Sequence, residues 1–366
     1  MTLLKSRQPL QYQTIVKKRR NFMLLMITLS TATLLSILLA VSLGTVQIAP
    51  EESYHILLYK MFNYNVGDFI SQVSPSHMDI IWQIRLPRVL MSVILGAGLA
   101  MCGTVMQATV QNPLAEPSIL GISAGAALGA TFSILIGGTS EMFFGFGTAF
   151  WAFLGALGAS FFVLLLSGIG SQMSTVKMVL SGAIASALFI ALSNFIIYMS
   201  SNAEGMRTVT FWTMGSLAAA KWDNLALPAI GVGLCCLFFL FQSRMLNTLL
   251  LGEEAAITLG VNLVKIRRIY LLLTALTTGL IVSTCGIFGF VGLVIPHIVR
   301  GLVGPDHRRL MPGTILVGAI FLTWADVLAR ILLKSGELPI GIITSLIGAP
   351  FFMYILFKHS FDFGSK

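Results

Sequence analysis

Two glutamates, Glu253 and Glu254, stand side by side in the stretch GEEAAITLG (252–260), which lies between two long apolar runs. Gly252 interrupts the preceding run and Gly260 follows about two helical turns later. Acidic side chains in a first turn complement the positive end of a helix dipole. We therefore predict a short capped helix here, and we expect its exposed acids to be a contact point for another protein.

A second candidate pair, Asp326 and Arg330, lies inside an apolar run near the C-terminus. Residues four apart share one face of a helix, and the order with the acid first is the favourable one. An ionisable group inside a membrane span often has a function, so a proton relay is the alternative to a structural ion pair.

Arg85 and Arg88, in the stretch IRLPRVL, mark the start of another apolar run. With Arg330 they are expected to form an exposed basic patch on one face of the membrane. The long side chains could simply snorkel to the interface. Alternatively, they form a docking site for an acidic partner, because charges at the rim of an interface steer and orient an encounter.

Enzymatic motifs do not account for the chain. The five histidines are scattered, no H-E-x-x-H occurs, and no phosphate-binding G-x-x-x-x-G-K-[ST] is present. The four cysteines lie inside apolar runs without metal-ligand spacing, so we expect neither disulfides nor a metal site. We predict that the chain is not an enzyme and that any ATP chemistry belongs to another polypeptide.

The elements that position these residues are membrane-spanning helices. Apolar residues make up 56% of the 366 residues, and several runs exceed the roughly 18 residues that cross a bilayer as a helix. The runs are continuously apolar, which favours an all-α bundle over a barrel. We predict about ten spans, near 22–45, 86–108, 118–138, 148–170, 177–200, 225–243, 267–287, 288–304, 310–331 and 340–358, with the seventh and eighth hard to divide.

The distribution of charge predicts the orientation. With both termini in the cytoplasm, the inside segments hold 16 of the 23 basic residues, including the cluster at 17–20, as the positive-inside rule expects. The net charge of +9 is therefore explained by membrane topology and does not indicate nucleic-acid binding.

We expect a basic cytoplasmic tail (1–20), then one permease domain (21–366) with an outer segment at 47–84 and a cytoplasmic loop at 249–264. A short interfacial helix is expected within 205–224, with Trp212 and Trp222 at headgroup depth.

The chain also resembles itself at an offset of 183 residues, where Arg85, Gly96, Cys102 and Pro113 align with Arg268, Gly279, Cys285 and Pro296. The aligned spans are five crossings apart and would run in opposite directions. Such an inverted repeat is typical of transporters, and shared composition is the alternative explanation. In each half a proline follows a glycine by ten residues (Pro113 after Gly103, Pro296 after Gly286), which predicts an interrupted helix in both halves. Separately, the glycines at 121, 125 and 129 predict tight helix packing.

Several longer motifs together resemble those of the permease subunit of type II ABC importers, the FecCD-like family that transports ferric siderophores, haem and cobalamin. The similar stretches are RLPR (85–88), MQATVQNPLAEPSILGISAGAALG (106–129), LLLGEEAAITLG (249–260), GFVGLVIPHIVR (289–300), DHR (306–308), ADVLAR (325–330) and ELPIGIITSLIGAP (337–350). The resemblance covers nearly everything after about residue 80. It leaves the N-terminal tail and the segment 47–84 without a counterpart.

The resemblance implies a dimer of ten-span permeases, identical or related, in a bacterial cytoplasmic membrane. Two cytoplasmic ATPase subunits would carry ATP and magnesium, with no cofactor on this chain, and an extracytoplasmic binding protein would deliver the substrate. Membrane lipid is an expected partner and nucleic acid is not. The resemblance assigns ATPase coupling to Gly252, Glu253, Glu254, Ala255, Ala256, Leu259 and Gly260, and binding-protein docking to Arg85, Arg88 and Arg330.

It also implies a cytoplasmic gate at Asn112, Pro113, Leu114 and Thr175, within the NPL stretch and the turn 171–177. Met106, Gln107 and Gln111 are candidate pathway-lining residues, because a bulky chelate needs little specific binding. The expected substrate is a ferric siderophore, with haem or cobalamin as alternatives. An ion-coupled secondary transporter would also have inverted repeats, but it would need deep ionisable residues, for which Asp326 is the main candidate.

Overall fold

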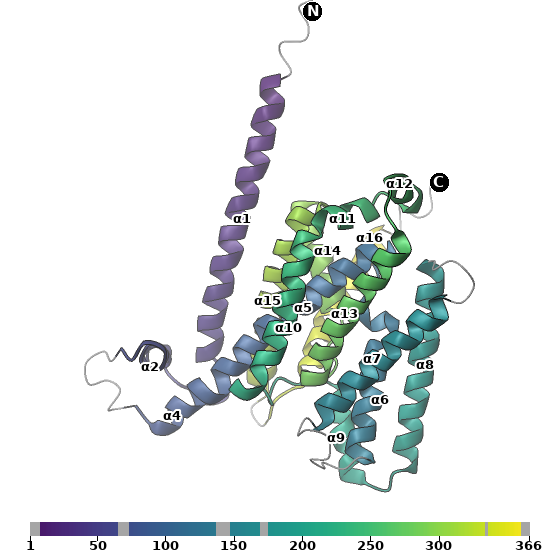
Figure 1. Cartoon of the computed structure of the whole chain (residues 1–366). Coiled ribbons are helices and arrows are strands. Elements are labelled where there is room, and N and C mark those ends of the chain that lie inside the picture. Colours follow the sequence, from purple (N-terminus) through teal and green to yellow (C-terminus); the bar gives the residue numbers. More distant parts are fainter. Residues whose placement is uncertain (1–7, 65–72, 137–146, 169–174, 334–335, 360–366) are drawn as a thin grey trace, which may run out of the picture.

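A computed structural model describes residues 8–64, 73–136, 147–168, 175–333 and 336–359 of the chain. The described residues form a bundle of helices without β-strands (Figure 1). The helices are α1 (Gln8–Ser42), α2 (Pro50–Phe62), α4 (Pro75–Asp79), η1 (Ile80–Arg85), α5 (Leu86–Val110), η2 (Pro117–Leu120), α6 (Ile122–Leu135), α7 (Gly147–Gly168), α8 (Thr175–Met199), α9 (Ala203–Thr213), α10 (Trp222–Phe241), α11 (Ser243–Leu249), α12 (Glu253–Thr258), α13 (Leu263–Cys285), α14 (Val291–Val303), α15 (His307–Ile331) and α16 (Ile340–His359).

The predicted spans correspond to these helices. Within the described residues, seven helices are long and apolar enough to cross a membrane, and α6, α14 and α16 are shorter apolar helices of the same bundle. The boundary between the seventh and eighth spans lies at 286–290, where Gly286 and Phe290 both have positive φ. The described part of the chain therefore has the predicted all-α architecture, with an apolar helix at each predicted span.

Helix α5 occupies the centre of the bundle and is buried along nearly its whole length. Glycines bring its neighbours close: a Cβ atom at Gly96 would clash with the carbonyl of Gly318 on α15, and one at Gly103 with the carbonyl of Gly292 on α14. Backbones can approach this closely only where no side chain intervenes. Because α5 also packs on α10 and α13, a movement at either of its ends reaches most of the bundle.

The glycine stripe on α6 packs against α7, as predicted. Added Cβ atoms at Gly125 and Gly129 would meet the carbonyls of Gly155 and Trp151, so these helices touch through their backbones. Gly121 has a different role, because it has a φ of +72° and separates η2 from α6.

Opposite directions of α5 and α13 are visible in Figure 1, as the repeat predicts. Pro113 lies in the loop after α5, so the first predicted interruption is present. The second half is also interrupted, but at 286–290, before Pro296, which lies inside α14. Cys102 is likewise in the middle of α5, whereas Cys285 ends α13. The aligned residues therefore do not keep equivalent positions within their helices.

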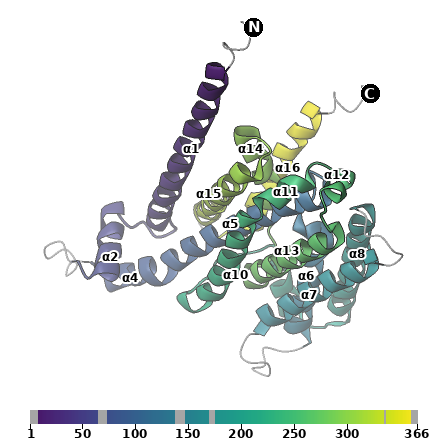
Figure 2. The same ribbon diagram turned by 45° about the horizontal axis from the view of Figure 1, so that its top comes forward.

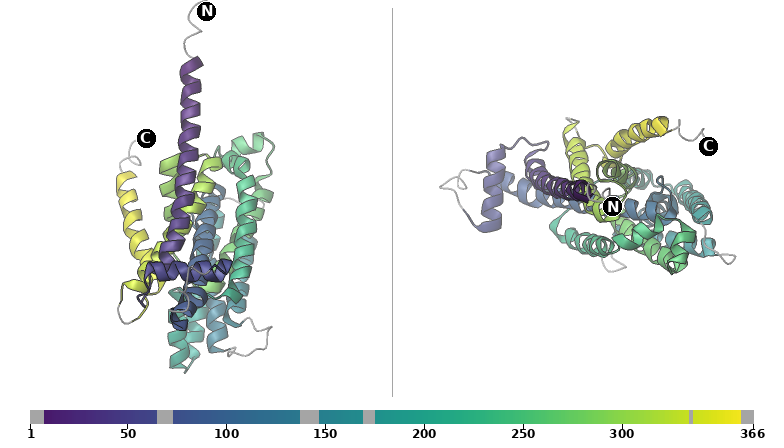
Figure 3. Two further views of the ribbon diagram at one scale, coloured as in Figure 1. Left: turned by 90° about the vertical axis from the view of Figure 1, so that its left-hand side faces the viewer. Right: turned by 90° about the horizontal axis from the view of Figure 1, so that it is seen from above.

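The basic N-terminal residues belong to the same helix as the first apolar run. Residues 8–42 form one continuous helix of 35 residues, which passes through residue 20. A helix of this length spans about 52 Å, well beyond the roughly 30 Å hydrocarbon core. Figure 1 shows its N-terminal part extending past the other helices, and Figure 3 shows α2 lying across its other end.

The outer segment also contains unpredicted structure. The helices α4, η1 and α5 are continuous, and η1 is a π-helix. Trp82 on η1 contacts Trp222 at the start of α10, with ring centroids 5.2 Å apart, and its carbonyl accepts a hydrogen bond from Trp222 Nε1 (2.9 Å). The short helix predicted within 205–224 is present as α9, but Trp222 is a packing residue at the α10 start.

Candidate functional site

The short helix α12 has the predicted boundaries. Gly252 precedes it with a φ of +97° and Gly260 follows it with a φ of +80°, both in the left-handed region that glycine tolerates best. Open space surrounds both glycines, so backbone conformation and not crowding requires them. Ala256 is fully buried, which fixes one face of the helix against the bundle.

The two glutamates have different environments. Glu253 Oε1 lies 2.7 Å from Arg267 Nη2 on α13, and Arg267 is almost completely buried. Arg267 Nε also donates a hydrogen bond to the carbonyl of Thr109 in the last turn of α5 (3.3 Å). Glu253 therefore links α12 to α13 and α5, whereas Glu254 is exposed to solvent.

Hydrogen bonds fasten α11 to two further helix ends. Gln111 Nε2 donates to the carbonyl of Leu249 (2.7 Å), which connects the end of α5 to the end of α11. Asn247 Nδ2 donates to Asp306 Oδ1 (2.7 Å), and the backbone N–H of His307 donates to Asn247 Oδ1 (2.8 Å). These contacts connect α11 to the start of α15.

The pKa of the Asp306 carboxyl group is affected by these hydrogen bonds to α11 and to the start of α15. Partial burial acts to raise the pKa of its carboxyl group, but hydrogen bonds from Asn247 and from the backbone N–H of Arg308 outweigh it, and the pKa is lowered. Asp306 also caps the N-terminus of α15. It is therefore an ionised link between α11 and α15 at neutral pH.

An exposed apolar surface surrounds α12. We call Leu250, Leu251, Glu254, Ile257 and Leu259 the coupling surface; its four apolar side chains are 46%, 63%, 61% and 63% exposed, respectively. Large exposed apolar groups on a polar end of a protein mark an interaction site. Sequence reasoning selected Leu259 and the glutamates but missed Leu250, Leu251 and Ile257, although they stand in the same motif. Figure 2 shows α11 and α12 beside the start of α13.

The predicted gate residues lie at the same end of the bundle. Asn112, Pro113 and Leu114 follow α5 directly, and Asn112 Oδ1 accepts a hydrogen bond from the Leu114 N–H (2.9 Å). Pro113 and Leu114 are exposed. Thr175 is the first residue of α8, and residues 169–174 of the predicted turn lie outside the described part of the chain.

The structure places two of the three candidate pathway residues, Met106 and Gln107, in buried positions between helices of this same chain. Thr274 Oγ1 donates to Met106 Sδ (3.5 Å), and Arg300 Nη2 donates to Gln107 Oε1 (2.8 Å). These contacts follow from the central position of α5, whose side chains bond to α13 and α14. Gln111 is exposed, but its amide belongs to the α11 contact.

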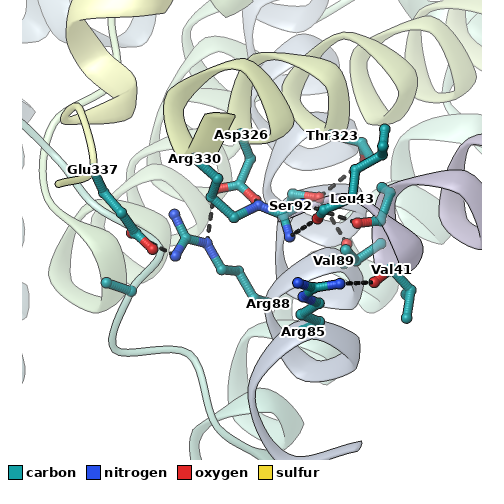
Figure 4. A network of polar contacts seen from close by, with 12 residues as sticks. Val41, Leu43, Arg85, Arg88, Val89, Ser92, Thr323, Asp326, Arg330 and Glu337 are labelled. Atoms are coloured by element: carbon teal, nitrogen blue, oxygen red, sulfur yellow. Dashed lines mark hydrogen bonds and ion pairs between the residues drawn. The ribbon is translucent and has the colours of Figure 1, made fainter. Parts of the chain in front are cut away.

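The three arginines at the opposite end do not form an exposed patch. Arg85, Arg88 and Arg330 are only 3–4% exposed. Arg88 Nε lies 2.9 Å from Asp326 Oδ1, and Arg88 Nη1 lies 2.6 Å from Glu337 Oε2 (Figure 4). The prediction of an exposed basic patch is wrong because acidic residues of α15 and of the following loop cover Arg88.

Arg85 and Arg330 satisfy the backbone at the end of α1. Arg85 donates to the carbonyls of Val41 (3.2 Å), Ser42 (2.8 Å) and Val46, and Arg330 donates to those of Ala40 (3.2 Å) and Leu43 (3.0 Å). The last carbonyls of a helix lack partners within the helix, and cations near them are favourable. These arginines are thus structural groups that hold α1 against α5 and α15.

The ion pair expected from the spacing of Asp326 and Arg330 is present. Asp326 Oδ2 lies 3.1 Å from Arg330 Nε, at ion-pair distance without hydrogen-bond alignment. Asp326 is fully buried and also pairs with Arg88. Two arginines around one acid favour the structural interpretation over a proton relay.

Comparisons with known proteins agree with this architecture. The sequence profile of the FecCD transport family matches residues 32–358. The chain is 40% identical to the hemin transport system permease protein HmuU of Yersinia pestis (76% of this chain, 85% of that protein). It is 42% identical to the cobalamin import system permease protein BtuC of Halobacterium salinarum (76% and 73%), and 39% identical to the molybdate import system permease protein MolB of Haemophilus influenzae (78% and 83%).

A solved structure of a metal-chelate type ABC transporter in an inward-facing conformation is also similar. The TM-score is 0.77 with 33% sequence identity, over 91% of this chain and 98% of that one. The ten apolar helices, the absence of a nucleotide-binding motif from the sequence and these relatives lead to one assignment. The chain belongs to the FecCD transport family and is the membrane-spanning permease subunit of an ABC importer, whose ATPase is carried by separate subunits.

Proposed function

We propose that this permease imports a metal chelate, with a ferric siderophore as its specific substrate. It works as a dimer with two cytoplasmic ATPase subunits and an extracytoplasmic binding protein. Both termini lie in the cytoplasm. In support, the N-terminus of α1, the helices α11 and α12 and the first turn of α15 share one end of the bundle (Figure 1). That end is rich in Lys and Arg, as cytoplasmic ends are.

Energy coupling is proposed to occur at the coupling surface. An ATPase that grips Glu254, Ile257 and Leu259 would move α12 when its own dimer closes on ATP. The observation that carries this proposal is the set of bonds from α11 and α12 to the ends of α5, α13 and α15. A force on α12 would reach three spanning helices through short polar contacts and tilt them.

Asn112, Pro113 and Leu114 are proposed as part of the cytoplasmic gate, together with Thr175. They follow the central helix α5 at the end next to Gln111, which is bonded to α11. Movement of α11 would therefore reach them directly. In this mechanism the chain supplies the pathway and the lever, and the ATPase subunits bind ATP and magnesium.

A chelated rather than a bare metal fits the residues available. Among the described residues, no group of three or more His, Cys, Asp or Glu side chains comes together as a metal site would require. Relatives are named for hemin, cobalamin and molybdate, and the similar structure is of metal-chelate type. These names support a metal-containing substrate as a class. Uptake measurements are needed to identify the individual substrate.

The test is an uptake measurement in cells from which this permease has been deleted, while its partner ATPase and binding protein are still produced. This chain is then supplied again. Radioiron-labelled ferric siderophore, haem, labelled cobalamin and molybdate would be supplied in parallel. We expect this chain to restore siderophore uptake. Restoration of haem, cobalamin or molybdate uptake alone would overturn the substrate and leave the permease role intact.

A further inference from the structure

A cavity of about 470 Å³ lies between α1 and the junction of α14 with α15. One wall is formed by Lys18, Asn21, Phe22 and Leu25 of α1, which the helical repeat places on one face. The cation of this wall, Lys18, lies nearest the N-terminus of α1, and the apolar side chains of Phe22 and Leu25 follow along the helix. The lining therefore changes from charged to apolar along the helix.

The facing wall has the same arrangement. Leu302 and Val303, at the end of α14, supply apolar surface, and Leu302 is 64% exposed. Arg309 of α15 supplies a second cation, whose guanidinium lies 5.8 Å from the centre of the Phe22 ring. This cation–π contact orients the guanidinium toward the cavity side of α1. Two cations, Lys18 and Arg309, thus line the same cavity as the apolar side chains of α1 and α14.

The depth of the cavity suits an amphiphile. The basic residues 17–20 directly precede the apolar part of α1, so Lys18 lies at the boundary of the hydrocarbon core. Basic pockets between spanning helices on the cytoplasmic side suit the headgroups of anionic lipids. The residues of α1 that line the cavity also precede the part of the chain matched by the family profile, which begins at residue 32.

We propose that this cavity binds an anionic phospholipid of the cytoplasmic leaflet. Its phosphate lies between Lys18 and Arg309, and one acyl chain follows Leu25 and Leu302. The lipid would hold the N-terminal part of α1 against α14 and α15. This inference depends on the cytoplasmic orientation proposed above, but not on the substrate.

The test is native mass spectrometry of the purified importer complex, titrated with phosphatidylglycerol or with phosphatidylcholine of the same acyl chains. The site variant is Lys18→Gln with Arg309→Gln. The matched control is Arg20→Gln with Arg308→Gln, which removes the same charge nearby from residues that do not line the cavity. At 100° per residue, Arg20 projects from nearly the opposite face of α1 to Lys18.

We expect wild type to prefer phosphatidylglycerol. A basic group near an anionic lipid contributes about fivefold in affinity, so the site variant should bind about 30-fold more weakly while the control remains near wild type. Equal losses in both variants would mean a diffuse charge effect and overturn the site. Unchanged binding in both would overturn it as well.

Two further measurements distinguish a lipid from a free phosphate compound and from a protein partner. Glycerol phosphate has the headgroup chemistry without acyl chains; if it displaces phosphatidylglycerol at equal concentration, the cavity is a phosphate site and the lipid proposal fails. The ATPase subunits are the other possible partner of this end. If the site variant loses co-purifying ATPase while its lipid binding is unchanged, the cavity is a protein contact and the proposal is overturned.

Discussion

Glu253 and Glu254 are adjacent in sequence but serve different purposes in the structure. Glu253 neutralises Arg267, a guanidinium that is 2% exposed at the junction of α5, α12 and α13. Glu254 is exposed on the coupling surface. Glu253 therefore stabilises the position of α12 against the bundle, whereas Glu254 is available for the proposed contact with the ATPase.

Replacing each glutamate separately distinguishes these roles. Glu253→Gln removes the negative charge beside the buried Arg267 guanidinium, which we expect to cost about 1–2 kcal/mol because Glu253 is itself half exposed. Glu254→Gln should change stability by no more than about 0.5 kcal/mol but weaken ATPase binding. Thermal unfolding in detergent measures the first effect. Identical melting of both variants would contradict the structural role of Glu253.

The buried arginines lead to a second prediction. Arg88→Met leaves the fully buried Asp326 with one cation in place of two and leaves Glu337 without its partner, so we expect a loss of about 3 kcal/mol. Arg207→Met, at an exposed arginine on α9, is the control and should be nearly neutral. If Arg88→Met melts like wild type but binds the binding protein more weakly, Arg88 is a docking residue after all.

Some of these residues could be predicted from sequence and some could not. The pair of Asp326 and Arg330 could, because helical spacing alone brings them together. The partners of Arg85 could not be predicted, because they are backbone carbonyls of α1, about 40 positions away. Every residue has a backbone carbonyl, so the residue types do not indicate which carbonyl is bonded. Glu337 likewise reaches Arg88 only after α15 has folded beside α5.

At the level of elements, helix contacts depend on where glycine removes a side chain. Gly155 on α7 faces the carbonyl of Gly125 on α6, so the two backbones touch. Gly158, three residues later on the same helix, has open space where a Cβ would be. The two glycines are therefore a natural matched pair.

Alanine at these two positions should have opposite effects. Gly155→Ala must push α6 and α7 apart, and we expect a destabilisation of about 1–3 kcal/mol. Gly158→Ala adds a methyl group into free space and should be neutral or stabilising by up to about 1 kcal/mol, since alanine favours helix. Melting temperatures in detergent test both. Equal destabilisation by both would refute the backbone contact.

Element positions were more predictable than element connections. Long apolar runs define spans, because only a helix satisfies its own backbone in lipid. The π-helical turn η1 and the break at 286–290 were not predictable, since both depend on contacts between helices. The burial of Met106 and Gln107 was not predictable for a related reason: the sequence does not distinguish a span residue that faces a pathway from one that faces a neighbouring helix.

The whole molecule connects two ends of different character through α5. At one end, α11 and α12 present the coupling surface and bond to α5, α13 and α15. At the other, buried arginines lock α1, α5 and α15 together. A force applied to α12 would thus act on α5 and α15, which these arginines join at the far end, and this favours tilting over independent sliding.

The most direct test of this account is to measure ATP hydrolysis and chelate uptake in the same vesicles containing the reconstituted importer. Ile257→Asp would remove the apolar contact that we propose between the ATPase and this side chain, which is 61% exposed in this chain. Burying such a side chain contributes about 1.5–3 kcal/mol, so uptake should fall at least about tenfold while the melting temperature stays near that of wild type. Wild-type uptake should stop with vanadate and persist with a protonophore. Uptake by Ile257→Asp at the wild-type rate would contradict the claim that α12 transmits the work of the ATPase.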